Sequence, residues 1–364
     1  MAPQDQTWTV KAILDWCEGY LANKGDAQPR LSAQWLLGEA MGLSRIELYT
    51  NLDKPLSEEE RTTMRAWVAR RGQGEPLQLI CGTAPFRHMV LEVAPGVLIP
   101  RPETEVLVSE VLAQFPVPRQ VSAFAFEAEP SEGNEPRESG ELIPVRKIGD
   151  SVQATVEVAA ESASETDPAE RETRASAEGS LSIALDGEGD QPIRVIDLCT
   201  GSGCIACALA TEHPNMEVVA LDIASEALDL AQRNAEAQGV ADRVTVLESD
   251  LLSVLMQDPA NIGAFDAIVS NPPYIPSSVV DMLDAEVSEF EPRLALDGGA
   301  DGLDLFRRFI DDAFALLKPR GILAVELFED SLETARAITL DHGFANTRIV
   351  DDLAGKQRIL VARR

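Results

Sequence analysis

The stretch Ser270-Asn271-Pro272-Pro273-Tyr274 has the residue types and the spacing to hold a flat nitrogen group. Two prolines fix φ and remove backbone donors, so we expect a stiff loop here. The side-chain oxygen of Asn271 and the carbonyl of Pro272 then present two acceptors, which suits an NH2 group held in a plane. Tyr274 offers a face for stacking on a flat substrate. We predict that Asn271, Pro272 and Tyr274 are catalytic, and that Pro273 joins them in binding substrate.

A second chemical signal lies upstream, where a predicted apolar strand runs through a glycine-containing turn into a helix. Gly201 and Gly203 permit a tight turn and close approach of the backbone to a ligand. The third glycine of the dinucleotide fingerprint is absent, so a nucleoside without a pyrophosphate fits better. A plain strand-to-helix turn is the alternative interpretation. The residues that we predict to bind a cofactor here are Asp197, Cys199, Thr200, Gly201, Ser202 and Gly203.

Acidic residues end the next two predicted strands. Asp222 lies 19 residues beyond Gly203, where a carboxylate is placed to accept hydrogen bonds from both ribose hydroxyls. Asp250, with Leu251 beside it, is placed to hold and cover an adenine. Each acid alone is also an acceptable helix cap. Three successive strand ends of this kind indicate an adenosine-type cofactor, and Asn271, at the end of the fourth strand, is a further predicted contact.

These two signals together favour methyl transfer from S-adenosyl-L-methionine to an amide or amine nitrogen, with S-adenosyl-L-homocysteine as product. An amide nitrogen is a poor nucleophile because its lone pair is delocalised, so in-line positioning must lower much of the barrier. The two acceptors also stabilise positive charge that grows on the nitrogen, so no dedicated base has to act first.

Strands and helices alternate with short connections through the C-terminal half, which predicts a doubly wound α/β sheet with its ligand beyond the carboxyl ends of the strands. The expected strands are 193–199, 217–223, 244–248, 265–270 and 321–327. The expected helices are 204–212, 225–238, 303–317 and 331–342. Residues 347–350 and 358–362 are expected to form an antiparallel hairpin at the sheet edge.

Upstream of the sheet, three segments have apolar residues at helical spacing: 8–21, 31–41 and 57–71. Ser44 and Ser57 are typical helix starts, each followed by an acid. The four tryptophans fall in this region and indicate either the core of a small helical bundle or a docking surface for a partner. The domains that we predict are an N-terminal helical, substrate-docking domain (1–80), a connecting segment (81–118), an acidic insertion (119–191) and a methyltransferase domain (192–364).

The insertion is low in complexity and acidic, with 17 acids and 5 bases between residues 120 and 190. Such a segment cannot bury enough apolar surface to offset chain entropy, so we expect it to be largely disordered. A tail that folds on a partner is the alternative.

The whole chain has a formal net charge of -30, which argues against direct binding of nucleic acid. No apolar run is long enough for a membrane span. The five cysteines have no framework spacing and the start of the chain has no basic region, so we expect a cytoplasmic protein. The three histidines are scattered, so we predict no metal.

Further stretches of the sequence indicate a particular family of methyltransferases. The runs Gly74 to Gly82, Pro95 to Glu105, Phe290 to Gly299 and Asp352 to Arg358, together with Asn271 to Tyr274, resemble the HemK/PrmC family of peptide chain release factor N5-glutamine methyltransferases. The resemblance covers residues 1–118 and 192–364. It implies a class I (Rossmann-like) methyltransferase fold, and methylation of the glutamine side-chain nitrogen in the Gly-Gly-Gln motif of class I release factors.

The same resemblance implies that the partner is the release factor protein. From the charge and the lack of a long apolar run we expect no direct contact to nucleic acid or membrane, and we expect a monomer. Arg101 and Glu103, in one of the family runs, either orient the substrate or brace the connection between domains. The chain departs from the family at Leu251, often a large aromatic, and at Glu326 to Asp330. A methyltransferase for the exocyclic nitrogen of a nucleic-acid base and a non-catalytic binding protein remain as alternatives.

Overall fold

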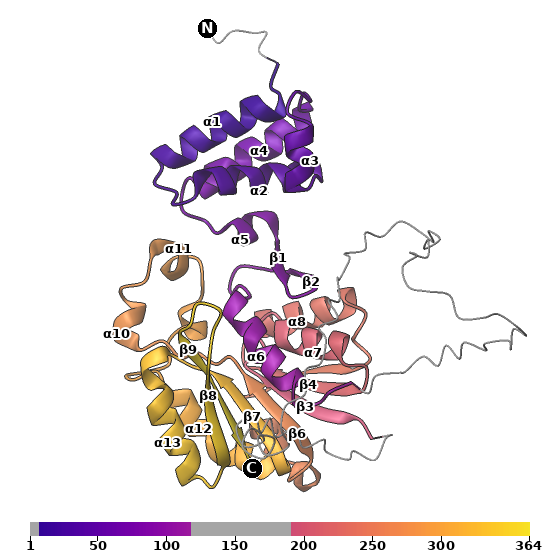
Figure 1. Ribbon diagram of the computed structural model, residues 1–364, viewed down its shortest axis with the longest axis vertical. Helices are drawn as coiled ribbons and strands as arrows, with labels where there is room; N and C mark the ends of the chain where they lie inside the picture. The colour runs from indigo at the N-terminus through magenta and orange to yellow at the C-terminus, as the bar shows by residue number, and fades with distance from the viewer. Residues whose placement is uncertain (1–6, 118–190) are drawn as a thin grey trace, which may run out of the picture. The chain divides into compact units, whose positions relative to one another are not determined.

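The computed structural model describes residues 7–117 and 191–364, all within one compact unit. The acidic insertion predicted for residues 119–191 lies outside the described residues, apart from its last residue. The described part is a mixed α/β structure with an N-terminal helical region (Figure 1).

The N-terminal helices enclose an apolar core of their own. They are α1 (Val10–Asn23), α2 (Pro29–Met41), α3 (Arg45–Thr50) and α4 (Glu58–Arg71). The two predicted helix starts are confirmed, because Ser44 and Ser57 each form a reciprocal capping box with a glutamate three residues later. Each box satisfies two backbone N–H groups that the first helical turn leaves without a partner.

The central sheet has seven strands in the order β5-β4-β3-β6-β7-β9-β8. These strands are β3 (Ile193–Leu198), β4 (Met216–Asp222), β5 (Val244–Glu248), β6 (Phe265–Ser270), β7 (Leu317–Glu326), β8 (Ala345–Asp351) and β9 (Gln357–Arg363). All pairs from β5 to β7 are parallel, whereas β9 pairs antiparallel with β7 and β8. The predicted doubly wound sheet and its final hairpin are confirmed, with β8 alone at the edge and β9 inside the sheet.

The order of the strands reverses beside β3, because the chain continues outward through β4 and β5 and then returns to the other side of β3 with β6. A crevice forms at the carboxyl ends of parallel strands at such a switch point, where open α/β sheets bind ligands. The four strands whose ends carry the predicted site residues are the four that meet there.

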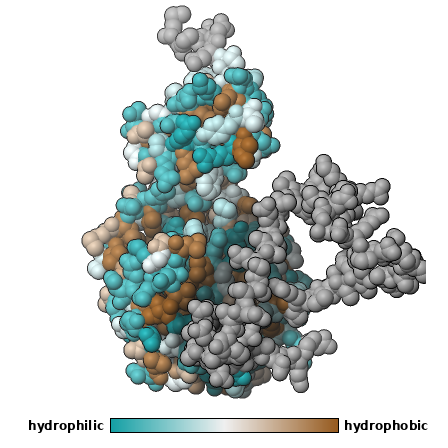
Figure 2. Space-filling model, in the orientation of Figure 1, coloured by the Kyte–Doolittle hydropathy of each residue, from teal (hydrophilic) through white to brown (hydrophobic). Residues whose placement is uncertain are grey.

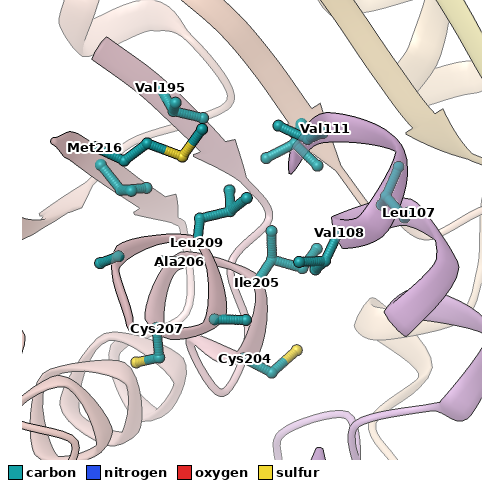
Figure 3. Packing of buried hydrophobic residues seen from close by; sticks show 14 of the residues in the cluster. Leu107, Val108, Val111, Val195, Cys204, Ile205, Ala206, Cys207, Leu209 and Met216 are labelled. Atoms are coloured by element: carbon teal, nitrogen blue, oxygen red, sulfur yellow. The ribbon is translucent and has the colours of Figure 1, made fainter. Parts of the chain in front are cut away.

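Helices cover both faces of the sheet (Figure 1). On one face lie α6 (Pro102–Leu112), α7 (Cys204–Glu212) and α8 (Ser225–Ala237), and on the other lie α12 (Asp304–Leu316) and α13 (Leu332–Asp341). Alternate strand residues enter the two cores: Val195 packs with the first group and Ile196 with the second. Figure 3 shows the first core, in which Val108 of α6 and Ile205 of α7 lie next to each other.

Three elements between the helical region and the sheet were not predicted. They are α5 (Leu77–Cys81) and the hairpin of β1 (Thr83–Phe86) with β2 (Met89–Glu92). The helix that follows them, α6, was also not predicted. Phe86, Met89 and Leu91 are buried in the same core as α6 and α7. The segment predicted to connect the domains therefore contributes side chains to the core of the sheet.

The remaining helical turns are short and lie in the connections between strands. They are α9 (Ser253–Met256), α10 (Ser277–Val280), α11 (Ala285–Ser288) and three 3-10 turns at Pro259–Asn261, Arg293–Ala295 and Glu329–Ser331. Among the described residues, no helix has both the length and the apolar character needed to cross a membrane. In Figure 2, hydrophobic residues are interspersed with hydrophilic ones on the visible face of the described part.

Candidate functional site

Asp197, near the end of β3, is fully buried and holds the glycine-containing turn together. Its Oδ2 accepts hydrogen bonds from the Thr200 hydroxyl (2.6 Å) and from the backbone N–H of Ala206 (3.0 Å). Its Oδ1 has no partner among the described residues. Burial raises the pKa of this carboxyl from 3.8 to about 7, against the lowering effect of the two hydrogen bonds. A buried acceptor without a partner suits a ligand with a donor or a positive charge.

The two glycines of this turn have positive φ, +54° at Gly201 and +78° at Gly203. A Cβ at Gly203 would lie 3.0 Å from the Cα and Cβ of Ala231 in α8, so a larger residue would force the two helices to shift. Gly201 and Ser202 line a cavity at the carboxyl end of the sheet, whereas Gly203 packs behind it.

Asp222, the last residue of β4, lies on the cavity wall. Its Oδ2 accepts a hydrogen bond from the backbone N–H of Gly201 at 2.9 Å. Its Oδ1 accepts from the backbone N–H groups of Ile223 (2.9 Å) and Ala224 (3.1 Å). A carboxylate has about four acceptor positions, so one position on Oδ2 stays open to a ligand hydroxyl. The carboxylate thus connects the glycine-containing turn to the end of the second strand.

The third predicted strand, 244–248, is confirmed as β5, and Asp250 lies two residues beyond its end. The backbone N–H of Ser249 still bonds to the carbonyl of Asp222, so Asp250 stays beside the cavity. Its carboxylate accepts two hydrogen bonds from Nη2 of Arg308 in α12, at 2.9 and 2.8 Å. Arg308 lines the cavity too, and no local pattern in the sequence predicted it.

Two non-glycine residues on the cavity wall have left-handed backbone conformations. These are Cys199, with φ of +60°, and Leu251, with φ of +54°. Such conformations cost a non-glycine residue roughly 1–2 kcal/mol and concentrate at functional sites. Their occurrence on one cavity supports the assignment of this cavity as the site.

Asn271 follows β6 and its amide is oriented by a threonine from a distant part of the chain. Its Nδ2 donates to Oγ1 of Thr104 in α6 at 2.9 Å. Among the described residues, no donor is bonded to Oδ1 of Asn271 or to the carbonyl of Pro272. The two acceptors predicted for an NH2 group are therefore not bonded to other parts of the described chain.

The loop after Asn271 is buried at Pro272 and anchored at Tyr274. The Tyr274 hydroxyl donates to Oε1 of Glu326 at 2.9 Å, and burial together with this carboxylate raises the pKa of the phenol well above 10. Gly298 packs against the loop, where a Cβ would lie 2.7 Å from the Cα of Tyr274. The glycine run near residue 298 is thus required for close contact between two backbones.

Within the run from Arg101 to Glu105, two side chains reach the site. Arg101 lines the cavity and pairs with the buried Glu291 at 2.6 Å, while Thr104 contacts Asn271. The prediction singled out Arg101 and Glu103 and missed Thr104. The contact between Thr104 and Asn271 spans 167 residues, so no spacing along the sequence indicates it.

Most of the predicted residues converge on this one cavity. Those that line it are Cys199, Thr200, Gly201, Ser202, Asp222, Asp250, Leu251, Asn271 and Pro273. Asp197, Gly203, Pro272 and Tyr274 are not part of the lining; they pack behind it or beside it. No group of three potential metal ligands occurs in residues 7–117 and 191–364.

The doubly wound sheet with a cavity at the carboxyl ends of β3, β4, β5 and β6 has the arrangement of the class I (Rossmann-like) methyltransferases. Models of two protein families match the chain: the PrmC N-terminal domain over residues 12–82 and the methyltransferase small domain over residues 183–286.

Full-length relatives define the family. A release factor glutamine methyltransferase of Geobacter sulfurreducens is 36% identical over 363 residues, covering 100% of this chain and 99% of the relative. The enzyme of the same name from Rhodopirellula baltica is 34% identical over 358 residues, covering 98% and 96%. A solved methyltransferase structure from Pyrococcus furiosus is 20% identical over 48% of this chain and 75% of that one, with a TM-score of 0.35, too low to support any conclusion. On its full-length relatives, the chain belongs to the family of release factor glutamine methyltransferases.

Proposed function

We propose that this protein transfers a methyl group from S-adenosyl-L-methionine to the side-chain amide nitrogen (N5) of the glutamine in the Gly-Gly-Gln motif of class I release factors. Family membership supports the reaction. The observation that carries the residue assignment is the orientation of Asn271, whose amide nitrogen bonds to Thr104 so that its oxygen is left for a substrate NH2 group. The nucleic-acid base alternative has no comparable support.

The cavity has features that fit S-adenosyl-L-methionine. The bound cofactor supplies an electrophilic methyl group on a positively charged sulfur. On the cavity wall, Asp222 keeps an open acceptor position next to the glycine-containing turn. Behind the wall, the buried Oδ1 of Asp197 has no partner among the described residues. We assign cofactor contacts to Asp197, Cys199, Thr200, Gly201, Ser202, Gly203, Asp222, Asp250, Leu251 and Asn271. Of these, Asp197 and Gly203 act from behind the lining.

The loop from Asn271 to Tyr274 would hold the substrate amide. Oδ1 of Asn271 and the carbonyl of Pro272 accept one hydrogen bond each from the substrate NH2, which fixes the plane of the amide. Tyr274 lies beside the cavity, and in this proposal its ring would stack on that plane, while Pro273, on the cavity wall, would limit the movement of the amide. The nitrogen would take the methyl group as the bond from that group to sulfur breaks, which leaves neutral S-adenosyl-L-homocysteine, and one of its two protons would pass to solvent water. Both acceptors stabilise the positive charge that grows on the nitrogen before the proton leaves.

The remaining assignments concern the protein partner, the cellular compartment and the oligomeric state. We assign release-factor docking to residues 1–80, where the side chain of Trp16 is 49% exposed and stacks on Tyr20. An exposed tryptophan is a frequent anchor at protein interfaces. The five cysteines are free thiols, which suits a cytoplasmic setting. We further propose that the enzyme acts as a monomer and does not bind nucleic acid directly.

The test is transfer of labelled methyl from S-adenosyl-L-methionine to a purified class I release factor, beside a release factor with Gln→Ala in its Gly-Gly-Gln motif. We expect label on the first protein and none on the second. Equal labelling of both would place the methyl group elsewhere, and no labelling of either, with cofactor bound, would refute the proposed substrate.

A further inference from the structure

Glu326 is the last residue of β7 and is buried, with 1% of its surface exposed. Both of its carboxylate oxygens are occupied by hydroxyl groups. Oε2 accepts from Thr104 at 2.7 Å and Oε1 accepts from Tyr274 at 2.9 Å. One buried acid thus connects α6 to the loop that follows β6, across the carboxyl end of the sheet.

Burial raises the pKa of the Glu326 carboxyl, and the hydroxyl groups of Thr104 and Tyr274 that donate to it lower that pKa. In its ionised form the carboxylate determines the direction of every hydrogen bond in this group. It can only accept, so Thr104 must use its single proton toward Glu326. The Thr104 oxygen is then an acceptor toward Asn271, and the group of Asn271 that faces it must be the NH2. The amide oxygen of Asn271 is consequently held on the side away from Thr104.

We propose that Glu326 is a positioning residue for methyl transfer, which orients Asn271 through the hydroxyl of Thr104 and holds Tyr274 directly. The proposal rests on the proposed glutamine methylation. A reversed Asn271 amide would present an NH2 group to the NH2 of the substrate, which removes one acceptor and adds repulsion between donors. Glu326 thus acts without touching substrate.

Three variants separate positioning from general stability. Thr104→Val keeps the shape of the side chain and removes its hydroxyl, whereas Thr104→Ser retains the hydroxyl. Glu326→Gln keeps the volume and replaces one acceptor with a donor. The matched control is Thr339→Val, because Thr339 is also fully buried and donates its hydroxyl, but to the carbonyl of Ala335 in α13.

With release factor as substrate, we expect Thr104→Val and Glu326→Gln each to lower kcat by about 10- to 100-fold, as misplacement of reacting groups does. The Kd for S-adenosyl-L-methionine should change by less than about threefold, or about 0.6 kcal/mol, because both variants leave the glycine-containing turn and Asp222 in place. Thr104→Ser should recover most of kcat, and Thr339→Val should not lower it. The double variant of Thr104→Val with Glu326→Gln should lose no more than Glu326→Gln alone, because both break one hydrogen-bonded chain.

A second readout does not depend on turnover. In the NMR spectrum, the side-chain NH2 signals of Asn271, assigned by their loss in Asn271→Ala, should shift in Thr104→Val and Glu326→Gln but not in Thr339→Val. If the wild-type enzyme transfers no label to the release factor, the proposed function is refuted. The NMR spectra would still decide whether Glu326 orients Asn271. Unchanged Asn271 signals in both variants, or losses in kcat that multiply in the double variant, would overturn the positioning role.

Discussion

The Asn271 side chain, at the end of β6, donates a hydrogen bond of 2.9 Å to the hydroxyl of Thr104 in α6, a residue 167 positions earlier in the chain. The helix that carries Thr104 packs against the same face of the sheet as α7. The orientation of the residue proposed to hold the substrate therefore depends on how α6 packs, and not only on the rigid loop in which Asn271 lies.

Replacement of Asn271 by alanine should nearly abolish methyl transfer. The change removes one of the two proposed acceptors for the substrate NH2, and loss of one such transition-state partner costs roughly 100- to 1000-fold in kcat. Calorimetry should show that cofactor affinity falls far less than kcat, because Asn271 is one of several assigned cofactor contacts and Asp222 and the glycine-containing turn are intact. Asn261→Ala is the control, since the Asn261 amide bonds to the carbonyl of Leu255 and does not line the cavity. An Asn271→Ala enzyme with wild-type turnover would exclude the proposed substrate position.

Asp222→Asn should instead weaken cofactor binding. Asparagine has an NH2 group in place of one carboxylate oxygen, and an NH2 group cannot accept a hydrogen bond. In one orientation of the amide this NH2 faces the N–H of Gly201, and in the other it faces those of Ile223 and Ala224. A hydrogen bond to a charged group contributes about 1.5–3 kcal/mol, so Kd for S-adenosyl-L-methionine should rise by about 10- to 100-fold.

The control for Asp222→Asn is Asp229→Asn, which removes the same charge from an exposed position on α8. Titration calorimetry with S-adenosyl-L-methionine measures both variants. If the two raise Kd equally, the effect comes from net charge, and the contact assigned to Asp222 is wrong.

Local patterns in the sequence predicted those parts of the site that neighbouring residues determine. Gly201, Gly203 and Asn271 come shortly after predicted strands and Asp222 lies at the end of one, and strands of a parallel sheet bring their carboxyl ends to one edge. Their convergence on one cavity thus follows once the strands are identified.

Contacts between residues far apart in the chain were not predictable in this way. Thr104 and Glu326 are separated by 222 residues, and the roles of both depend on the packing of α6 against β7. The hairpin of β1 and β2 was missed because each strand has only four residues, too few to show alternation. β7 begins at Leu317, four residues before the prediction, because Leu317 pairs with Phe265 across an irregularity in register.

The raised pKa of Asp197 predicts a particular dependence of stability on pH. The native carboxyl has a pKa of about 7, against 3.8 for an ordinary aspartate, so between these values the native state binds more protons than the unfolded state. The free energy of unfolding should therefore fall as pH rises from about 4 to about 7, and this contribution should be constant above that range. The pKa difference corresponds to an upper limit of roughly 4 kcal/mol.

Asp197→Asn isolates that contribution, because asparagine resembles the neutral carboxyl and does not titrate. Urea unfolding of both proteins between about pH 5 and pH 8 should show the wild type losing stability relative to the variant as pH rises. All other acids contribute equally to the two proteins, so the difference between the curves belongs to Asp197. Parallel curves would mean that Asp197 is ionised throughout.

The contact between Gly203 and Ala231 predicts how tightly α7 and α8 pack beneath the glycine-containing turn. Gly203→Ala adds a Cβ 3.0 Å from the Cα of Ala231, at a φ of +78° that alanine disfavours. Gly239→Ala is a matched control, because Gly239 has a φ of +69° and its added Cβ meets nothing within 4 Å. Both variants should lose about 1–2 kcal/mol from backbone strain, and Gly203→Ala about 1–3 kcal/mol more from overpacking.

Urea unfolding measures the difference in stability between the two variants. Binding of S-adenosyl-L-methionine measures whether the same contact also affects the cavity. Because α7 begins immediately after Gly203, its displacement should also move Gly201 and Ser202 on the cavity wall, so Gly203→Ala should raise Kd for S-adenosyl-L-methionine while Gly239→Ala should not. Adding Ala231→Gly to Gly203→Ala removes the opposing Cβ and should recover part of both losses, although a glycine within α8 itself costs about 1 kcal/mol. Equal destabilisation by the two single variants would show that the helices separate without cost, and that Gly203 is required only for its backbone conformation.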